Sequence, residues 1–266
     1  MIKENLIITW ILCKKNISLY IKRGPVLIFG LMFPFFITLS WVIGRNLSPS
    51  QIFIGIVAMT AFFTSTAISP VVLPVETREK SLERQLYYPI SIYHILLGIL
   101  FASFLYSFII TLIITIAFIF ILSVTFSSIL QIIILIIGIG LITLFGSSLG
   151  LLLSGIPSDM TSDIMVVSNL IKFPLVFISG VFIPLNLAPF SLLILSLFSP
   201  LTYFTDLMRF CTNTNPFFNM GINLAILVMW IIILLIANIV FHRKTMPKRF
   251  SEGNGNQKKS KKKGKA

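Results

Sequence analysis

Six long apolar stretches, separated by short polar connections, dominate the pattern of hydrophobic and polar positions along the chain. They cover residues 25–43, 52–73, 94–122, 129–155, 164–184 and 221–241. A helix of about 20 apolar residues is long enough to cross a bilayer core of about 30 Å. The apolar runs are continuous rather than alternating, so membrane-spanning strands are not predicted. The pattern predicts an all-α polytopic membrane protein with six transmembrane helices.

The composition excludes a soluble globular protein. The chain has 266 residues, of which 56% are hydrophobic and 11% are charged. A soluble domain of this size could not bury so much apolar surface. We do not expect a cleaved signal peptide, because Lys14 and Lys15 interrupt the first apolar run and no small-residue cleavage site follows. Residues 2–22 instead predict an interfacial amphipathic helix in which Trp10 and Tyr20 face lipid, with a short cytosolic lead-in as the alternative.

The uneven distribution of basic residues predicts the orientation. Five lie before the first span, three lie between spans two and three, and ten follow the last span. With six spans these three regions share one side of the membrane, whereas the other side has only Arg45 and Arg209. The positive-inside rule therefore predicts that both termini are cytoplasmic.

Residues 242–266 form a lysine-rich tail with interspersed glycines, and they account for much of the formal net charge of +13. Such a composition predicts a disordered polybasic segment. A basic residue next to an anionic leaflet contributes about 1 kcal/mol of membrane binding, so anionic lipids are the expected partner of this tail. Nucleic acid is not expected as a partner, because no aromatic residues interleave the lysines.

The densest charge cluster between the spans lies at residues 76–86. As one continuous helix, this segment places Glu76, Glu79 and Glu83 at three- and four-residue steps along one face, with Leu82 on a separate face. A charged amphipathic helix is suited to docking in a groove on a partner. A solvated helix with local ion pairs explains the pattern equally well.

Proline and glycine punctuate the chain between spans five and six. Gly180 and Pro184 end span five, and Pro200 opens an amphipathic segment before the final span. This pattern predicts re-entrant helices on the outer side of the membrane. Asp206 and Arg209 are three residues apart on the second of these helices, which predicts a cap and an ion pair rather than a gate.

Span five carries polar residues at helical spacing. Ser162, Asn169, Lys172 and Ser179 lie on one helical face. Lys172 is close to mid-span, where a lysine costs about 2.5–3.5 kcal/mol, so it should face a polar cavity or a dimer seam. Our hypothesis is that Asn169, Lys172 and Ser179 line a translocation route that favours anionic or carbonyl-bearing substrates. A lysine that snorkels or bonds to backbone carbonyls is an equally good explanation.

Two segments resemble the ABC-2 type transporter permeases. The first is the outer re-entrant motif, which consists here of Gly180, Pro184, Pro200, Tyr203, Asp206 and Arg209. The second is Lys80-Ser81-Leu82-Glu83, followed by Pro89, Ser91 and Gly98. In that family the second segment is the coupling helix that inserts into the ATP-binding subunit. The resemblance therefore implies a coupling role for Glu76, Glu79, Leu82 and Glu83, although Lys80-Ser81 replaces the family's Gly-Thr pair.

The resemblance also implies partners. Two permease chains, identical or different, would work with two copies of a separate ABC ATP-binding subunit. This chain lacks the Gly-x-x-x-x-Gly-Lys-[Ser/Thr] run of a P-loop, so ATP and Mg are expected on that partner. No catalytic residue, metal site or cofactor is expected in this chain.

The expected function is export of a hydrophobic or amphipathic small molecule or lipid across a prokaryotic plasma membrane. A polysaccharide or glycolipid exporter of the same superfamily and a non-transporting membrane scaffold are the alternatives. An intramembrane enzyme is disfavoured, because His94 and His242 both lie at the edge of the predicted spans and no nucleophile–base motif is present.

Overall fold

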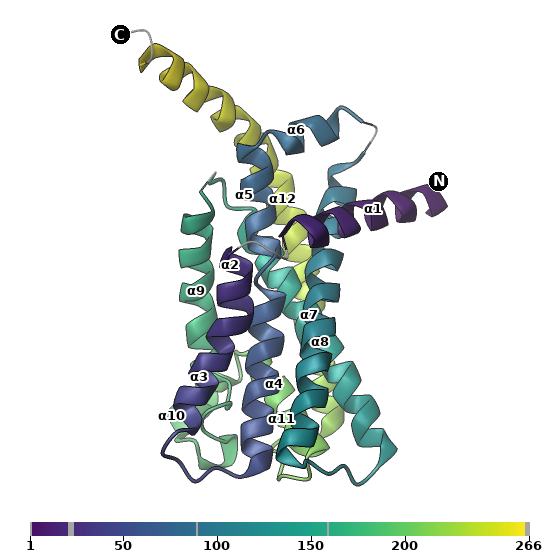
Figure 1. Ribbon diagram of the computed structural model, residues 1–266, viewed down its shortest axis with the longest axis vertical. Helices are drawn as coiled ribbons and strands as arrows, with labels where there is room; N and C mark the ends of the chain where they lie inside the picture. The colour runs from purple at the N-terminus through teal and green to yellow at the C-terminus, as the bar shows by residue number, and fades with distance from the viewer. Residues whose placement is uncertain (1, 21–23, 89, 159, 264–266) are drawn as a thin grey trace.

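The computed structural model describes residues 2–20, 24–88, 90–158 and 160–263, and no strand occurs among them. In the described chain, five segments are long and apolar enough to cross a membrane, and they run along the long axis of the molecule (Figure 1). They are α4 (Pro49–Ser65) with α5 (Ser69–Arg78), α7 (Ile92–Leu122), α8 (Ile129–Ser154), α9 (Thr161–Ile178) and residues 220–246 of α12 (Met220–Lys263). The predicted all-α polytopic class is confirmed.

The first apolar stretch forms a broken helix. It consists of α2 (Gly24–Leu27), a π-helical turn (Ile28–Met32) and α3 (Phe33–Val42). Pro34 lies in the first turn of α3 and has no backbone N–H to donate to the preceding turn, so the regular hydrogen-bond ladder is interrupted there. The pieces follow one another along the bundle beside α4 (Figure 1).

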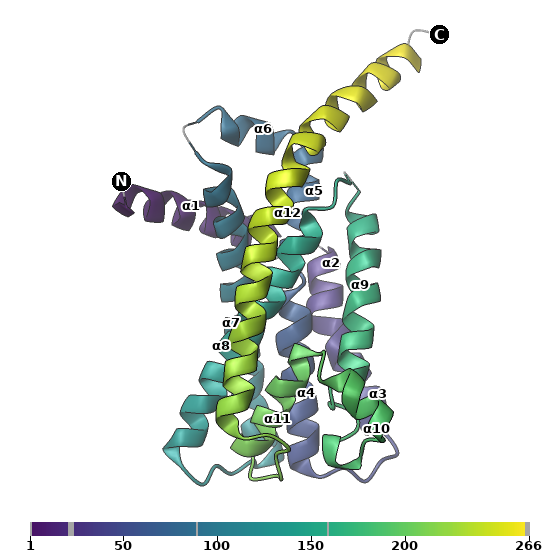
Figure 2. The same ribbon diagram turned by 180° about the vertical axis from the view of Figure 1, so that it is seen from behind.

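Helices α10 (Phe190–Ser196) and α11 (Pro200–Cys211) are joined at a sharp bend of 102°. A short 3₁₀ turn, Leu185–Leu187, separates them from α9. Both helices lie at the end of the bundle opposite the two chain termini (Figures 1 and 2). This bent pair occupies the region for which the sequence predicts re-entrant helices.

Helix α1 (Ile2–Tyr20) lies crosswise to the bundle, at the same end as α6 (Ser81–Leu86) and the C-terminus (Figures 1 and 2). It packs against α7, where a Cβ atom on Gly98 would come within 2.7 Å of the Cβ of Leu12. Trp10 is 60% exposed, as expected of an interfacial helix. The expectation that Tyr20 faces lipid was wrong, because the last turn of α1 enters the bundle and Tyr20 is buried in its core. Residues 21 and 22 of the predicted helix lie outside the described residues.

The sequence predicts a disordered tail over residues 242–266, of which residues 242–263 belong to a helix in the structure. Helix α12 continues without a break to Lys263 and projects away from the bundle (Figure 2). Lysine and glutamine have high helix propensities, so this polar sequence can extend a helix that the bundle has already nucleated. Residues 264–266 lie outside the described residues.

Two apolar clusters stabilise the bundle. The larger one joins α4, α8, α11 and α12 through residues such as Phe62, Ile139, Phe204 and Leu227. The smaller one joins α1, α5, α6 and α7 near the end that carries the termini. Close approach of α8 to α4 requires Gly146, because a Cβ atom there would collide with the side chain of Ser65.

Candidate functional site

The charged segment at residues 76–86 is not one helix. Helix α5 ends at Arg78, and Lys80 has a left-handed backbone with φ of 55°. Helix α6 then begins at Ser81. The expectation that Glu76, Glu79 and Glu83 share one helical face was therefore wrong, since the turn at Lys80 gives the two parts of the segment different axes. Arg84 stabilises this turn by donating from Nη2 to the backbone carbonyl of Glu79 at 3.0 Å.

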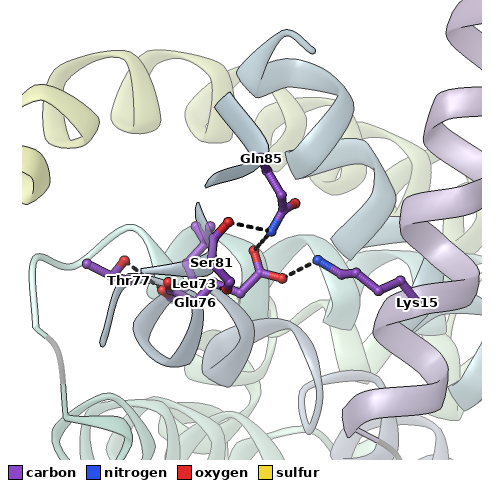
Figure 3. Close-up of polar contacts among 6 residues, drawn as sticks. All are labelled: Lys15, Leu73, Glu76, Thr77, Ser81 and Gln85. Atoms are coloured by element: carbon purple, nitrogen blue, oxygen red, sulfur yellow. Dashed lines mark hydrogen bonds and ion pairs between the residues drawn. The ribbon is translucent and has the colours of Figure 1, made fainter. Parts of the chain in front are cut away.

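Glu76 lies inside a polar cluster that joins three helices (Figure 3). Its side chain is 2% exposed, and its Oε1 lies 2.5 Å from Nζ of Lys15 on α1. Its Oε2 accepts a hydrogen bond of 3.1 Å from Nε2 of Gln85 on α6. Ser81 donates to the backbone carbonyl of Glu76 at 3.3 Å. These contacts fix the start of α6 relative to α5 and α1.

The other predicted coupling residues divide into buried and exposed positions. Leu82 is fully buried in the smaller apolar cluster, where it joins Val75 and Ile95. Glu79 and Glu83 are exposed at the end of the bundle that carries the termini. In this geometry Glu76 and Leu82 hold α6 on the bundle, whereas Glu79 and Glu83 lie on the exposed surface. Lys15 and Gln85 complete the cluster and were not identified from the sequence.

Lys172 on α9 is fully buried within a single chain rather than exposed toward a second copy. Its Nζ lies 5.5 Å from the centroid of the Phe63 ring and has no hydrogen-bond partner among the described residues. Phe33 and Phe173 complete an aromatic group with Phe63, with ring centroids 5.3–6.1 Å apart. A cation over aromatic faces is stabilised by their quadrupoles.

The other residues on this face of α9 differ in their surroundings. Asn169 is half-buried, and its Oδ1 also lacks a partner in the described part of the chain. Ser179 is buried and donates to the carbonyl of Val176 at 2.6 Å. Ser162, at the other end of α9, is exposed. The unpartnered polar atoms of Asn169 and Lys172 lie close to the middle of the helix, beside the buried hydroxyl of Ser168, which also lacks a partner among the described residues.

Backbone carbonyl groups at the end of α9 accept hydrogen bonds from side chains of α11 and of Ser199, the residue before α11. Ser199 donates to the carbonyl of Leu175 at 3.0 Å, and Thr205 donates to that of Ser179 at 2.8 Å. Arg209 Nη2 donates to the carbonyl of Gly180 at 2.6 Å. Gly180 has a positive φ of 73°, which a glycine adopts without strain. The re-entrant motif therefore joins α9 to α11.

Further residues of the motif shape the local backbone. Pro184 precedes the 3₁₀ turn, and Pro200 occupies the first turn of α11, where its missing N–H removes no helical hydrogen bond. The hydroxyl of Tyr203 donates to the carbonyl of Leu197 at 2.9 Å across the α10–α11 bend.

Asp206 anchors the start of α12. Its carboxylate accepts hydrogen bonds from the backbone N–H groups of Phe217 and Phe218, at 2.7 and 2.8 Å, and from the side chain of Asn223 at 2.9 Å. The two side chains bind different hydrogen-bond partners, so the described residues show no direct ion pair between them, although the Asp206 carboxylate still acts electrostatically on Arg209. The predicted structural role of Asp206 is consistent with these three bonds.

Comparison with known families gives one match. The family described as ABC-2 type transporter matches residues 8–213, which include α6, α9 and the α10–α11 pair. No curated protein matches the chain. The matched region contains both segments whose residues carry the resemblance.

Proposed function

The chain belongs to the ABC-2 type transporter family, and on that basis we propose that it is the permease of an exporter driven by ATP hydrolysis on its partner. Membership makes it a multi-pass membrane component of an ABC-type transport system, with the ATP-binding subunit as a separate partner. The proposed cargo is a hydrophobic or amphipathic small molecule or lipid. The proposed location is a prokaryotic plasma membrane with both termini in the cytoplasm.

One observation carries the proposed coupling mechanism: α6 is fixed to the bundle by Glu76 and Leu82, while Glu83 on α6 is exposed, as is Glu79 at the end of α5. A short helix that is packed on one side and exposed on the other can transmit a displacement of a docked subunit to the helices that it packs against. Here those helices are α5 and, through Lys15, α1. We place the ATP-binding subunit on the exposed side of α6.

The proposal also assigns roles to residues of α9, to a second permease chain and to the end of α12. Asn169, Lys172 and Ser179 are the proposed lining of the translocation route, and Lys172 is its cationic group. A second permease chain, identical or different, completes the proposed assembly with two ATP-binding subunits. The basic end of α12 is the proposed contact with anionic lipids.

The test is co-purification of the full chain from its native membrane in mild detergent, followed by identification of any P-loop ATPase. Glu83→Arg reverses the charge on the exposed side of α6, and Glu4→Arg is a matched reversal at an exposed position of α1. We expect a stoichiometric ATPase with the parent chain and with Glu4→Arg, and its loss with Glu83→Arg.

Two other results would change the proposal. If Glu83→Arg retains the ATPase, the docking surface does not lie on α6, but the proposal of an ATP-driven exporter stands. A parent chain without an ATPase under several extraction conditions would contradict the proposed coupling to ATP hydrolysis.

A further inference from the structure

Two adjoining cavities open at the end of the bundle opposite α6. The first has a volume of about 360 Å³ and the second of about 450 Å³. They share the side chains of Trp41, Phe182 and Ile183. Arg209 lines the first cavity and Arg45 lines the second. Volumes of this size are typical of sites for small molecules.

Two side chains that line the first cavity each carry a buried donor nitrogen with no acceptor in the described chain. These nitrogens are Nε1 of Trp41 and Nη1 of Arg209. Each of these side chains is only 7% exposed. The guanidinium of Arg209 is held in place by the bond from Nη2 to the carbonyl of Gly180, whereas its Nη1 has no hydrogen-bond acceptor among the described residues. Burying a donor without an acceptor costs about 1–3 kcal/mol, and more for a charged group.

The charge around these donors favours an anion. Among the described residues that line the two cavities, none is acidic. Asp206, one turn from Arg209 on α11, acts electrostatically on its guanidinium, but it lines neither cavity. Arg45 on the second cavity leaves the two arginines with one positive charge in excess of this carboxylate. Asn46 and Gln51 add polar groups to the wall of the first cavity.

We propose that the first cavity binds the oxyanion head group of an amphipathic molecule, a carboxylate or a phosphate monoester. Arg209 Nη1 and Trp41 Nε1 donate to the oxyanion, as guanidinium groups do to planar and tetrahedral anions elsewhere. This assignment concerns a binding site at the end of the bundle opposite α6. It does not depend on whether the chain exports that molecule.

The second cavity is suited to the apolar part of the same molecule. Its walls include Ile37 and Phe177, and Phe177 stacks on Phe182 with a centroid separation of 5.3 Å. Trp41 packs edge-on against Phe182 at 5.5 Å, which places its ring between the two cavities. An alkyl chain that leaves the oxyanion site past Phe182 would thus meet an apolar surface.

The test uses the full chain in phosphatidylcholine nanodiscs, with Trp10→Phe and Trp230→Phe so that Trp41 is the remaining tryptophan. Decyl phosphate is the probe, and Trp41 fluorescence is the signal. We expect a saturable change, and we expect Arg209→Gln to raise the dissociation constant at least tenfold. Inorganic phosphate should compete weakly because it lacks the apolar part. Replacing a tenth of the disc lipid with phosphatidic acid, whose head group is a phosphate monoester, distinguishes the sources: competition by it identifies a lipid head group, and its absence identifies a free amphiphile.

Arg209→Gln also removes a bond to Gly180, so a second variant keeps the test independent of folding. Gln51→Glu introduces a negative charge at the first cavity, and glutamate preserves the capping box that Gln51 forms with Ser48. Asn219→Asp makes a matched change at the exposed residue that precedes α12, and α12 begins at the same end of the bundle. We expect at least a tenfold weaker affinity in Gln51→Glu and less than a twofold change in Asn219→Asp. Equal affinities in Gln51→Glu and the parent, equal losses in both charge variants, or no saturable signal in the parent would overturn the proposal.

Discussion

Lys15 on α1 and Glu76 on α5 form an ion pair across 61 residues of sequence, with Nζ 2.5 Å from Oε1. The same carboxylate accepts a hydrogen bond from Gln85 on α6. One buried carboxylate thus joins a crosswise helix, the end of a predicted span and the proposed docking helix (Figure 3). Any displacement of α6 that preserves these bonds must involve α1.

Replacing Lys15 with methionine should destabilise the chain, because Glu76 would keep its charge inside the bundle without its cation. Hydrogen bonds to charged groups contribute about 1.5–3 kcal/mol, and we expect a loss in this range in the free energy of unfolding in detergent. Lys14→Met is the matched control, since Lys14 is exposed on the same helix. Adding Glu76→Gln to Lys15→Met should restore part of the loss. A loss no larger than that of Lys14→Met would show that the pair is not a significant contact.

Asp206→Asn should loosen the beginning of α12. An asparagine has one acceptor oxygen and no charge, so it cannot reproduce the bonds to both Phe217 and Phe218. We expect faster hydrogen exchange of those two backbone amides and a loss of about 1.5–3 kcal/mol in stability. The same substitution at exposed Asp163, which binds Ser158 and Ser162 instead, should leave the exchange of the Phe217 and Phe218 amides unchanged. Unaltered protection at Phe217 and Phe218 would contradict the assigned anchor.

Lys172→Leu should change stability and export in opposite directions. Removing a buried cation that has only an aromatic partner should raise stability, by up to about 2.5–3.5 kcal/mol if the site resembles the centre of a bilayer. If Lys172 serves the translocation route, export should nevertheless fall at least tenfold, and Lys172→Arg should retain part of it. Vesicle export assays together with thermal unfolding provide both values. Normal export by a folded Lys172→Leu chain would exclude the route hypothesis.

Two glycines on α8 provide a matched test of helix packing. A Cβ atom on Gly146 would collide with Ser65, whereas one on Gly140 would lie 3.7 Å from the ring of Phe108, an ordinary van der Waals contact. Gly146→Ala should therefore destabilise the bundle by about 1–3 kcal/mol through overpacking. Gly140→Ala should be neutral or stabilising by up to about 1 kcal/mol, because alanine favours the helix. Thermal unfolding of the two variants side by side measures the difference, and similar midpoints would refute the close contact.

The sequence predicted the helices better than it predicted their contacts. Long apolar runs are sufficient to predict α7, α8 and the first part of α12, because each helix satisfies its own backbone hydrogen bonds. The break in the first stretch follows from Pro34, whose effect on the backbone is local. The turn at Lys80 was missed, because a helical wheel assumes a continuous axis and Lys80 has no strong turn signal.

The candidate site depended on contacts between distant residues, which a single sequence does not reveal. Lys15 and Glu76 are each unremarkable in their own segments, and only packing of α1 across α7 brings them together. Similarly, the i, i+3 spacing of Asp206 and Arg209 favoured an ion pair, but better-placed partners lie in other elements. Gly180 and Phe217 are such partners.

The bonds between α9 and α11 also constrain how the chain is made. The carbonyls of Leu175, Ser179 and Gly180 receive their partners from residues that are synthesised 24, 26 and 29 positions later. Each unsatisfied polar backbone group in hydrocarbon costs several kcal/mol. The end of α9 therefore gains these protein partners only after α11 has been synthesised, so the hydrogen bonding of α9 is completed later than the helix itself.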